Sequence, residues 1–407
     1  MKQKWEYKKL GDACRDVTDF VAAGSFADLR KNVVYNSEPD FAQLIRTTDL
    51  KRKFTNSDYV YVSKSAFEYL WRVNLDKACI ILPNVGNCGE VYYVSPNDLP
   101  YENNVLGPNA VLVRSYTENQ RFLAYAFKGN DFQSQLKSIV GTVAQPKFNK
   151  TNLKNLTVPV PPMDEQQRIV AELDLLTEVI DKQKTQLKEL DTLAQSIFYD
   201  MFGDPTHNEK GWDVKKLENV VANEKYALKA GPFGSALKKE FYKESGYKIY
   251  GQEQVIANDV SVGNYYIDES KYQELKSCSI KEDDVLISLV GTFGKILIVP
   301  KQFEPGIINP RLIKISFDGS IINTTFFKSF FSCESSQQML KTMIHGQTMG
   351  VLNLGILRQM RIPIPPLAIQ QEFADKIQSI EKQKAAINQS IANTQKLLDY
   401  TMDKYFG

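Results

Sequence analysis

A proline-rich string of ten residues occurs twice in this chain, and this repeat constrains the architecture more than any other feature. The first copy is Val158-Pro-Val-Pro-Pro-Met-Asp-Glu-Gln-Gln167, and the second is Ile362-Pro-Ile-Pro-Pro-Leu-Ala-Ile-Gln-Gln371. The copies lie 204 positions apart, which is far longer than the roughly 20–50 residues of solenoid repeats. The repeated unit is therefore a whole module together with its connector.

Two other strings recur with nearly the same spacing. Trp5-Glu-Tyr-Lys-Lys-Leu10 returns as Trp212-Asp-Val-Lys-Lys-Leu217, and Met201-Phe-Gly203 returns as Tyr405-Phe-Gly407. We therefore predict an alternation of two globular modules with two helical spacers, which occupy residues 1–157, 158–203, 204–361 and 362–407 in that order.

The composition is that of a globular protein of two or three domains, with 407 residues of which 43% are hydrophobic and 24% are charged. No apolar run reaches the roughly 18 residues that a membrane span needs, and no signal-peptide core follows Met1. We expect a cytoplasmic protein that makes no membrane contact. The five cysteines form no Cys-x-x-Cys pair and the chain has two histidines, so we expect reduced structural thiols and no metal site.

The net charge of +2 is distributed unevenly between modules and spacers. The formal net charge, counted as lysines and arginines less aspartates and glutamates, is +5 for residues 1–156, −5 for 157–203, +2 for 204–361 and 0 for 362–407. This pattern suits modules that meet nucleic acid and spacers that meet protein. The alternative is a solvated surface whose charge is merely uneven.

Each proline string predicts the start of a long helix just after Pro162 or Pro366, because proline fixes the preceding backbone in an extended form and suits the first helical turn. Asp164 and Glu165 would then lie where the helix dipole favours negative charge. Apolar residues follow at heptad spacing, interrupted by Gln183 and Lys384, which could fix register or partner. The seam is Ile169, Leu173, Leu176, Ile180, Leu187, Leu190, Ala194, Ile197 and Met201 in the first copy and Phe373, Ile377, Ile380, Ile387, Ile391, Thr394, Leu398, Thr401 and Tyr405 in the second.

Such a helix would form a rod of roughly 57 Å at 1.5 Å per residue, and it cannot bury its apolar stripe alone. We expect the two helices to pair as an antiparallel coiled coil with pseudo-two-fold symmetry, with the modules at opposite ends.

The modules themselves read as mixed α/β structure. Residues 78–94 and 283–299 each predict two strands joined by a glycine turn, and further strands are expected at 59–62, 110–114 and 312–316. Residues 122–127 and 324–333 are expected to be helical. The fold class is therefore α+β, with long polar loops that can vary without disturbing a core.

Motifs of common catalytic sites are missing. The segment Gly291-Thr-Phe-Gly294-Lys295 lacks the glycine spacing of a phosphate loop, and Ile296 stands where a magnesium-binding hydroxyl is needed. No dinucleotide fingerprint, amino-methyltransferase motif or nucleophile elbow is present, so we expect no catalytic residue and no bound cofactor. The adjacent Asp283 and Asp284 would point to opposite faces of a strand, which indicates a solvated turn.

Basic, aromatic and amide side chains gather instead in the polar segments of both modules. Lysine and arginine neutralise phosphates, whereas arginine, glutamine and asparagine can read base edges through paired hydrogen bonds. Each position also has an ordinary alternative as a structural or solvated residue. The candidate DNA-contacting residues are Arg46, Lys51, Arg52, Lys53, Tyr59, Thr142, Gln145 and Lys147 in the first module and Lys238, Lys239, Gln252, Gln254, Arg311, Gln347 and Thr348 in the second.

The whole pattern resembles the specificity (S) subunits of type I restriction-modification systems. The resemblance covers the entire chain and is carried by the Trp-x-x-x-x-Leu starts, by Leu352-Asn353, and by both proline strings with their glutamines. The stretch Gly231-Pro-Phe-Gly-Ser-Ala-Leu-Lys238 is similar to one common in such modules, whereas the first module has Gly24-Ser-Phe-Ala-Asp-Leu-Arg30. That departure suggests different recognition subtypes and different targets.

The resemblance implies a non-catalytic subunit in which each module recognises one half of a split, asymmetric double-stranded DNA sequence. It also implies that the helices set the spacer and dock two methyltransferase (M) subunits, which carry S-adenosylmethionine, and that restriction (R) subunits join to use ATP and magnesium. Residues expected to form the helix pair and docking surface are Leu173, Leu176, Ile180, Leu187, Leu190, Ile377, Ile380, Ile387 and Ile391. Two alternatives remain open: a coiled-coil scaffold whose modules bind protein or glycan, and a stand-alone nuclease or methyltransferase.

Overall fold

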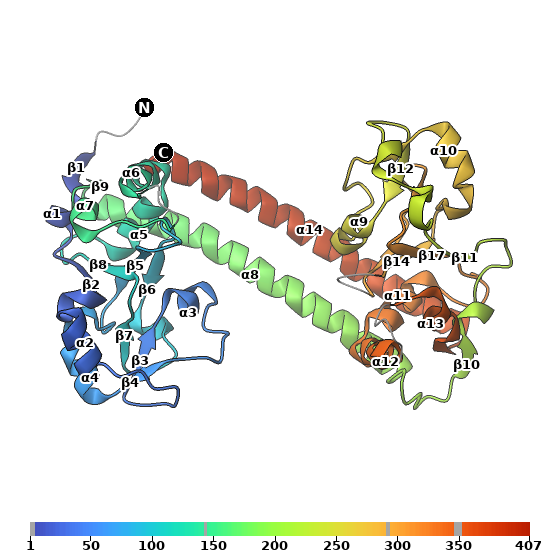
Figure 1. Cartoon of the computed structure of the whole chain (residues 1–407), viewed down its shortest axis with the longest axis horizontal. Helices are drawn as coiled ribbons and strands as arrows, with labels where there is room; N and C mark the ends of the chain where they lie inside the picture. The colour runs from blue at the N-terminus through green and yellow to red at the C-terminus, as the bar shows by residue number, and fades with distance from the viewer. Residues whose placement is uncertain (1–4, 142–144, 290–293, 346–351) are drawn as a thin grey trace. The chain divides into compact units, whose positions relative to one another are not determined.

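The computed structural model describes residues 5–141, 145–289, 294–345 and 352–407. The chain divides into two compact units (Figure 1). One unit comprises Met1–Gln183 with Ser390–Gly407, and the other comprises Lys184–Gln389. Each unit therefore contains one module, one half of the first long helix and the opposite half of the second.

The first unit begins with the elements of the first module, which end where the first long helix starts. In chain order they are β1 (Glu6–Lys9), α1 (Leu10–Ala13), β2 (Asp16–Asp19), α2 (Phe26–Asn32), β3 (Ala42–Ile45), α3 (Thr47–Lys51), β4 (Tyr61–Val62), α4 (Lys64–Tyr69), β5 (Cys79–Pro83), β6 (Tyr92–Val94), β7 (Asn104–Leu106), β8 (Ala110–Arg114), α5 (Gln120–Lys128), α6 (Asn130–Ile139), α7 (Lys150–Lys154), β9 (Thr157–Val160) and the long helix α8 (Met163–Phe202).

The second module repeats this sequence of elements, except that no α-helix corresponds to α1 or α2 among its described residues, and it leads into the second long helix. Its elements are β10 (Asp213–Lys216), β11 (Leu228–Ala230), β12 (Tyr247–Tyr250), α9 (Gln252–Ala257), β13 (Tyr266–Ile267), α10 (Glu269–Glu274), β14 (Val285–Ser288), β15 (Ile296–Ile298), β16 (Gly306–Ile308), β17 (Leu312–Ile315), α11 (Thr324–Ser332), α12 (Glu334–His345), α13 (Leu354–Gln359), β18 (Arg361–Ile364) and the long helix α14 (Leu367–Phe406).

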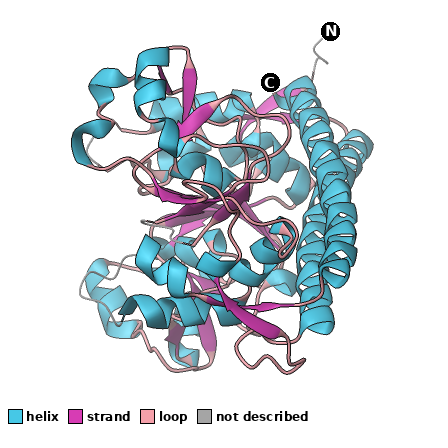
Figure 2. Ribbon diagram, turned by 90° about the vertical axis from the view of Figure 1, so that its right-hand side faces the viewer, coloured by secondary structure: helices cyan, strands magenta, loops and turns pink. Residues whose placement is uncertain are grey.

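The two modules have the same sheet topology. The four-stranded sheet β2-β8-β5-β6 of the first corresponds to β11-β17-β14-β15 of the second, and the three-stranded sheet β4-β3-β7 corresponds to β13-β12-β16. Within the smaller sheets β3 is parallel to β7, as β12 is to β16. The predicted mixed α/β modules and internal repeat are thus confirmed, and Figure 2 shows short strands among helices and long loops.

In each module, the string at the start and the proline string at the end pair with each other in a two-stranded sheet. Strand β1 pairs antiparallel with β9, and β10 pairs with β18 in the same way. The amide of Leu10 then donates to the carbonyl of Leu156 (2.7 Å), and the amide of Leu217 donates to that of Met360 (2.9 Å). Each module therefore has its first and last strands tied together at the point where the long helix begins.

The end of a long helix completes the core of each module. Tyr405 and Phe406 of α14 lie in the core of the first module, where the Trp5 ring stacks on Tyr405 with centroids 6.1 Å apart. Phe198 and Phe202 of α8 occupy the corresponding core of the second module. The repeated Met/Tyr-Phe-Gly strings therefore mark the C-terminal end of each long helix, where the helix enters a hydrophobic core.

A buried glutamine in the first turn of each long helix links the helix to its own module. The Asn119 amide donates to Gln166 Oε1 (2.8 Å), while Gln166 Nε2 donates to the carbonyl of Pro161 (2.9 Å). In the second unit the Asn323 amide donates to Gln370 Oε1 (2.8 Å), and Gln370 Nε2 donates to the Pro365 carbonyl (2.8 Å). Both glutamines are at most 1% exposed. We call this arrangement the glutamine latch.

Asn119 and Asn323 are themselves the N-cap residues of α5 and α11, and both cap through their side chains. Each latch therefore joins three elements: the proline string, the start of a long helix and the start of the first large helix of the module. Because a buried amide must have all its hydrogen-bonding groups satisfied, the latch fixes the position of the long helix against the module.

The long helices start at Met163 and Leu367, directly after the prolines, as predicted. In the first unit the N-terminal half of α8 lies beside the C-terminal half of α14, and Gln183 Nε2 donates to Ser390 Oγ (2.7 Å) (Figure 1). In the second unit Lys384 Nζ lies 2.8 Å from Asp191 Oδ1. The pairing is antiparallel in both units, and the two polar interruptions of the seam make contacts between the helices.

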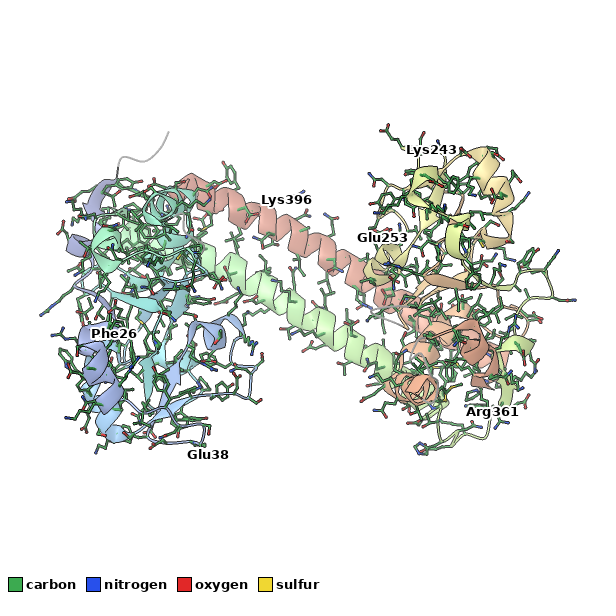
Figure 3. All side chains as sticks on the ribbon, in the orientation of Figure 1. Phe26, Glu38, Lys243, Glu253, Arg361 and Lys396 are labelled. Atoms are coloured by element: carbon green, nitrogen blue, oxygen red, sulfur yellow. The ribbon has the colours of Figure 1, made fainter. Side chains whose placement is uncertain are left out.

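The predicted seam positions are all buried or half-buried, on helices whose other faces are largely exposed. Lys396, for example, extends from α14 into solvent (Figure 3). The seam accounts for the helix pairing, while the predicted docking of methyltransferase subunits on these helices stays a prediction.

The latch predicts a large loss of stability when either glutamine is removed. Gln166→Ala leaves the Asn119 amide and the Pro161 carbonyl without their partner, and we expect a loss of about 2–4 kcal/mol, since each buried unsatisfied group costs about 1–3 kcal/mol. Denaturant titration followed by circular dichroism measures this loss. The exposed neighbour Gln167 is the matched control, and Gln167→Ala should change stability by less than about 0.5 kcal/mol. Equal effects of the two changes would contradict the latch.

Candidate nucleic-acid interface

The predicted basic cluster of the first module is built on a buried carboxylate. Asp49 lies in the first turn of α3 and its side chain is fully buried. It accepts hydrogen bonds from the Arg46 amide (2.8 Å), from Arg46 Nε (3.1 Å) and Nη2 (2.8 Å), and from Asn56 Nδ2 (2.9 Å). The hydrogen bonds to Asp49 raise the pKa of Arg46, which therefore stays charged. Arg46 is 30% exposed and acts mainly as a brace.

The loop after α3 is held by the same network. Arg46 Nη2 donates to the Asp58 carbonyl (2.7 Å), and Asn56 Nδ2 donates to Asp58 Oδ1 (3.0 Å). The Tyr59 hydroxyl donates to the Phe54 carbonyl (2.6 Å), so Tyr59 also supports the loop. We call Arg46, Asp49, Asn56 and Asp58 the loop frame. It presents the exposed side chains of Arg52 and Lys53 at a fixed place.

The backbone of this loop is unusual. Lys53 and Phe54 both adopt left-handed conformations, with φ of 49° and 57°. Residues other than glycine rarely adopt this region, and they persist there only where the surroundings determine the conformation. The loop frame supplies those surroundings, so the two left-handed residues mark a shaped loop tip.

Other predicted residues of the first module lie at the neighbouring hairpin turn between β5 and β6. Lys51 Nζ lies 2.6 Å from Glu90 Oε1, beyond the turn. Burial raises the pKa of Glu90, but hydrogen bonds from Lys51 and Tyr92 outweigh it and hold the pKa below its usual range. The segment with Gln145 and Lys147 is exposed, and the Pro146 carbonyl accepts from the Gly86 amide (2.8 Å).

The fold thus brings Lys51, Gln145 and Lys147 to one hairpin turn, next to the loop that carries Arg52 and Lys53. Residues separated by about a hundred positions in the sequence form one basic and amide-rich surface. Thr142 lies outside the described residues.

The second module has a frame at the corresponding place, built on an amide instead of a carboxylate. The Gly251 amide donates to Gln254 Oε1 (2.7 Å), and Gln254 Nε2 donates to the Val262 carbonyl (2.7 Å). Gln254 is 1% exposed, so it has the role of Asp49 in the first module. The predicted base contact of Gln254 is untested, but in this structure its amide is buried and both of its ends are used by the fold.

Gln252 and Arg311 lie around this second frame. Gln252 begins α9 and is half-buried, and Glu253 beside it is exposed (Figure 3). The exposed Arg311 follows Asn309, whose amide donates to the Tyr250 carbonyl (2.8 Å) at the end of β12. The Arg311 carbonyl accepts from the Leu289 amide (3.0 Å) at the turn after β14. Arg311 therefore lies between the start of α9 and that turn.

Lys238 and Lys239 are exposed on the loop that precedes β12, where Lys238 Nζ lies 3.7 Å from Glu240 Oε1. The pKa of Tyr242, on the same loop, is raised by burial and then by the negative charge of Glu253, while the positive charge of Arg311 opposes this shift. The loop is thus electrostatically coupled to the surface around α9. Gln347 and Thr348 lie outside the described residues.

The prediction missed two aromatic residues on the surface. Phe233 is 84% exposed and Phe26 is 77% exposed, and Phe26 extends from the start of α2 (Figure 3). Both lie two residues after a glycine near the start of a module, and this shared position was the signal in the sequence. Exposed aromatic rings can stack on or wedge between bases.

In the described parts of the chain, no three histidine, cysteine, aspartate or glutamate residues are placed to hold a metal ion. Burial raises the pKa of Cys14 and of Cys79 to about 12, so these thiols are protonated and poorly nucleophilic. Within the same residues no helix has the length and apolarity to cross a membrane. The features that the structure does show are two similar surfaces, each on a framed loop beside a hairpin turn.

The protein thus has two similar modules on antiparallel helices, and each module carries a basic and amide-rich surface next to a frame. This arrangement defines a recognition protein with two binding modules. The chain belongs to the family described as the type I restriction modification DNA specificity domain, which matches residues 2–192 and again 209–395.

Relatives with known roles agree with this family. The chain is 23% identical to the type I restriction enzyme MjaIX specificity subunit of Methanocaldococcus jannaschii, over 98% of this chain and 92% of that protein. It is 20% identical to the EcoKI specificity subunit of Escherichia coli K12, over 90% and 82%. The solved S subunit from M. genitalium has the same fold, with a TM-score of 0.57, 15% identity and coverage of 99% and 96%.

The loop frame predicts a local effect of Asp49→Ala. Without the buried carboxylate, the Arg46 side chain and Asn56 lose their common acceptor, and the loop should open more often. We expect trypsin to cleave native protein after Lys51, Arg52 or Lys53 about ten times faster, as measured by mass spectrometry of the fragments. Asp98→Ala, at an exposed aspartate, is the control and should leave the cleavage rate unchanged. An unchanged rate in Asp49→Ala would show that the frame does not hold the loop.

Proposed function

We propose that the chain is the non-catalytic DNA sequence-recognition subunit of a type I restriction-modification complex. Each module would bind one half of a two-part, asymmetric double-stranded DNA target. The observation that carries this proposal is the duplication: two modules of one topology present different side chains at corresponding frames, Arg46 with Asp49 in one and Gly251 with Gln254 in the other. A protein so built binds two different sequences through one geometry.

The division of labour within each surface follows from side-chain chemistry. Lys51, Lys53 and Lys147 are flexible point charges suited to phosphates, which give affinity and position without sequence information. Arg52, Gln145 and Arg311 carry forked donors or amides suited to base edges in the major groove. The frames hold these groups in place before binding, which reduces the entropy lost when the complex forms.

The chemistry of the complex would come from partner subunits. Methyltransferase subunits would bind along α8 and α14 and bring S-adenosylmethionine, and restriction subunits would bring the ATP- and magnesium-dependent cleavage. The net charge of −5 on residues 157–203 favours contact of this spacer with protein over contact with DNA. A pair of methyltransferase subunits, one for each module, suits the two-fold repeat.

The test is DNA binding as a function of salt. For the wild-type chain we expect the logarithm of the binding constant to fall steeply with the logarithm of the salt concentration. The triple change Lys51→Ala, Arg52→Ala and Lys53→Ala should reduce this slope by about 2, because the two lost phosphate contacts of Lys51 and Lys53 remove about 0.9 each. Fluorescence anisotropy with a labelled duplex measures the slope.

The matched control removes three cations from the other side of the same module. Lys8, Lys9 and Lys154 lie on β1 and at the end of α7, away from α3 (Figure 1), and their replacement by alanine should leave the slope nearly unchanged. Binding without salt dependence would contradict the proposal and favour a scaffold whose modules bind protein or glycan. Methyl transfer by the isolated chain would also contradict it.

A further inference from the structure

The two junctions between module and long helix differ, although the latch at each is the same. In the first unit an arginine bridges the junction. Arg121 Nε of α5 lies 2.7 Å from Asp174 Oδ1 of α8, and the Tyr125 hydroxyl donates to the same oxygen (2.6 Å). The Arg121 guanidinium also lies over the Tyr93 ring at 5.2 Å. This unit therefore contains its own guanidinium–carboxylate pair between helix and module.

The corresponding positions of the second unit carry smaller or uncharged side chains. Counting 204 residues on, Arg121 becomes Thr325, Tyr125 becomes Ser329 and Asp174 becomes Gln378. A cavity of about 560 Å³ lies between α11 and α14 at this place, and all three residues line it. A second cavity of about 300 Å³, which shares Ser329 with the first, continues along α8. We call the two cavities together the junction groove.

The groove has an acidic lining with one partly buried lysine. Asp283, Asp375 and Glu381 line it together with Lys328. Lys328 Nζ donates to Asn258 Oδ1 (2.8 Å), and burial lowers the pKa of Lys328 while Glu381 raises it.

The carboxylates differ in their partners. Glu381 has a cation of its own, Lys384, at 3.0 Å. Asp375 accepts from Gln371 Nε2 (3.0 Å), but no lysine or arginine of the described residues lies within ion-pair distance of Asp375 or Asp283. The groove therefore offers two carboxylates without a cation, at the place where the first unit has an arginine.

We propose that the junction groove receives an arginine side chain from a methyltransferase subunit docked on the long helices. This inference rests on the proposed function, which places that subunit along α8 and α14. The first unit supplies the argument for the chemistry: the same junction there is bridged by the guanidinium of Arg121, which pairs with a carboxylate of the long helix. A planar guanidinium suits carboxylate pairing better than an ammonium does.

The volume of the groove fits an occupant larger than water. Cavities that bind ligands are roughly 300–1,000 Å³, so 560 Å³ admits an arginine with neighbouring backbone. Two identical methyltransferase subunits would then meet different junctions, one open and one already bridged. They would bind with two different affinities, and the second unit would hold its subunit more tightly.

The test fills the groove by copying the first unit. Thr325→Arg with Gln378→Asp introduces the pair that Arg121 and Asp174 form, and we expect at least tenfold weaker binding of one methyltransferase subunit while the other binds as before. Native mass spectrometry of a titration of the full chain with the methyltransferase subunit of its own system resolves the two steps. Gln378→Asp alone adds a carboxylate without filling the groove, and it should leave both steps at least as strong.

A second variant removes charge without adding bulk. Asp283→Asn with Asp375→Asn changes two groups at the surface of the groove, and we expect severalfold weaker binding at the same step. Thermal unfolding and DNA binding of each variant alone should match wild type, which separates a docking defect from a folding defect.

The outcomes distinguish this inference from the function on which it rests. A wild-type chain that binds two methyltransferase subunits, with both variants binding them equally well, would overturn the groove proposal and leave the proposed function intact. A wild-type chain that binds none would overturn the proposed function and the groove proposal together.

Discussion

The buried glutamine of each latch is the contact on which the rest of the molecule depends. Gln166 and Gln370 are nearly inaccessible to solvent, and each uses both ends of its amide. One end holds the first large helix of the module, and the other holds the proline string that precedes the long helix. Because both are hydrogen bonds in a dry interior, a shift of the long helix against the module would leave buried groups unpaired. The latch thus gives each module a fixed orientation on its helix.

This fixed junction allows the loops to vary. The sheets and the phenylalanine-rich cores are buried, whereas side chains next to the frames, such as those of Arg52, Lys53 and Arg311, are exposed. Asp49 and Gln254 show how a frame is kept while its chemistry changes, since both accept the amide at the start of a short helix, one through a carboxylate and one through an amide. In a recognition protein, this arrangement allows the surface side chains that determine specificity to change while the core stays the same.

The sequence predicted the parts of this structure that depend on local pattern. The prolines fixed the helix starts at Met163 and Leu367, and heptad spacing predicted the seam. The latch residues also follow the repeat, because Asn119 and Asn323 are 204 positions apart, as are the two glutamines. Nothing in the local sequence, however, marks an asparagine as the partner of a glutamine 47 residues later.

The sequence could not separate exposed candidate residues from buried ones, because burial is a tertiary property. The buried Gln254 and the half-buried Gln252, two residues apart, look alike in the sequence, and only the fold shows that Gln254 is a brace. The sequence likewise suggests that Arg46 binds phosphate, whereas the structure shows that its guanidinium is paired with the buried carboxylate of Asp49. Lys51, Arg52 and Lys53 are exposed, as a polar loop suggests, and their contact with DNA stays a prediction.

The central claim is that each module reads its own half of one two-part DNA sequence. Sequencing of methylated bases in a host that expresses this chain with its methyltransferase subunit tests it most directly, when repeated with residues 212–361 exchanged for those of a related chain. The account predicts a two-part methylated motif of which only one half changes after the exchange. A motif without two parts, or an exchange that changes both halves or neither, would contradict it.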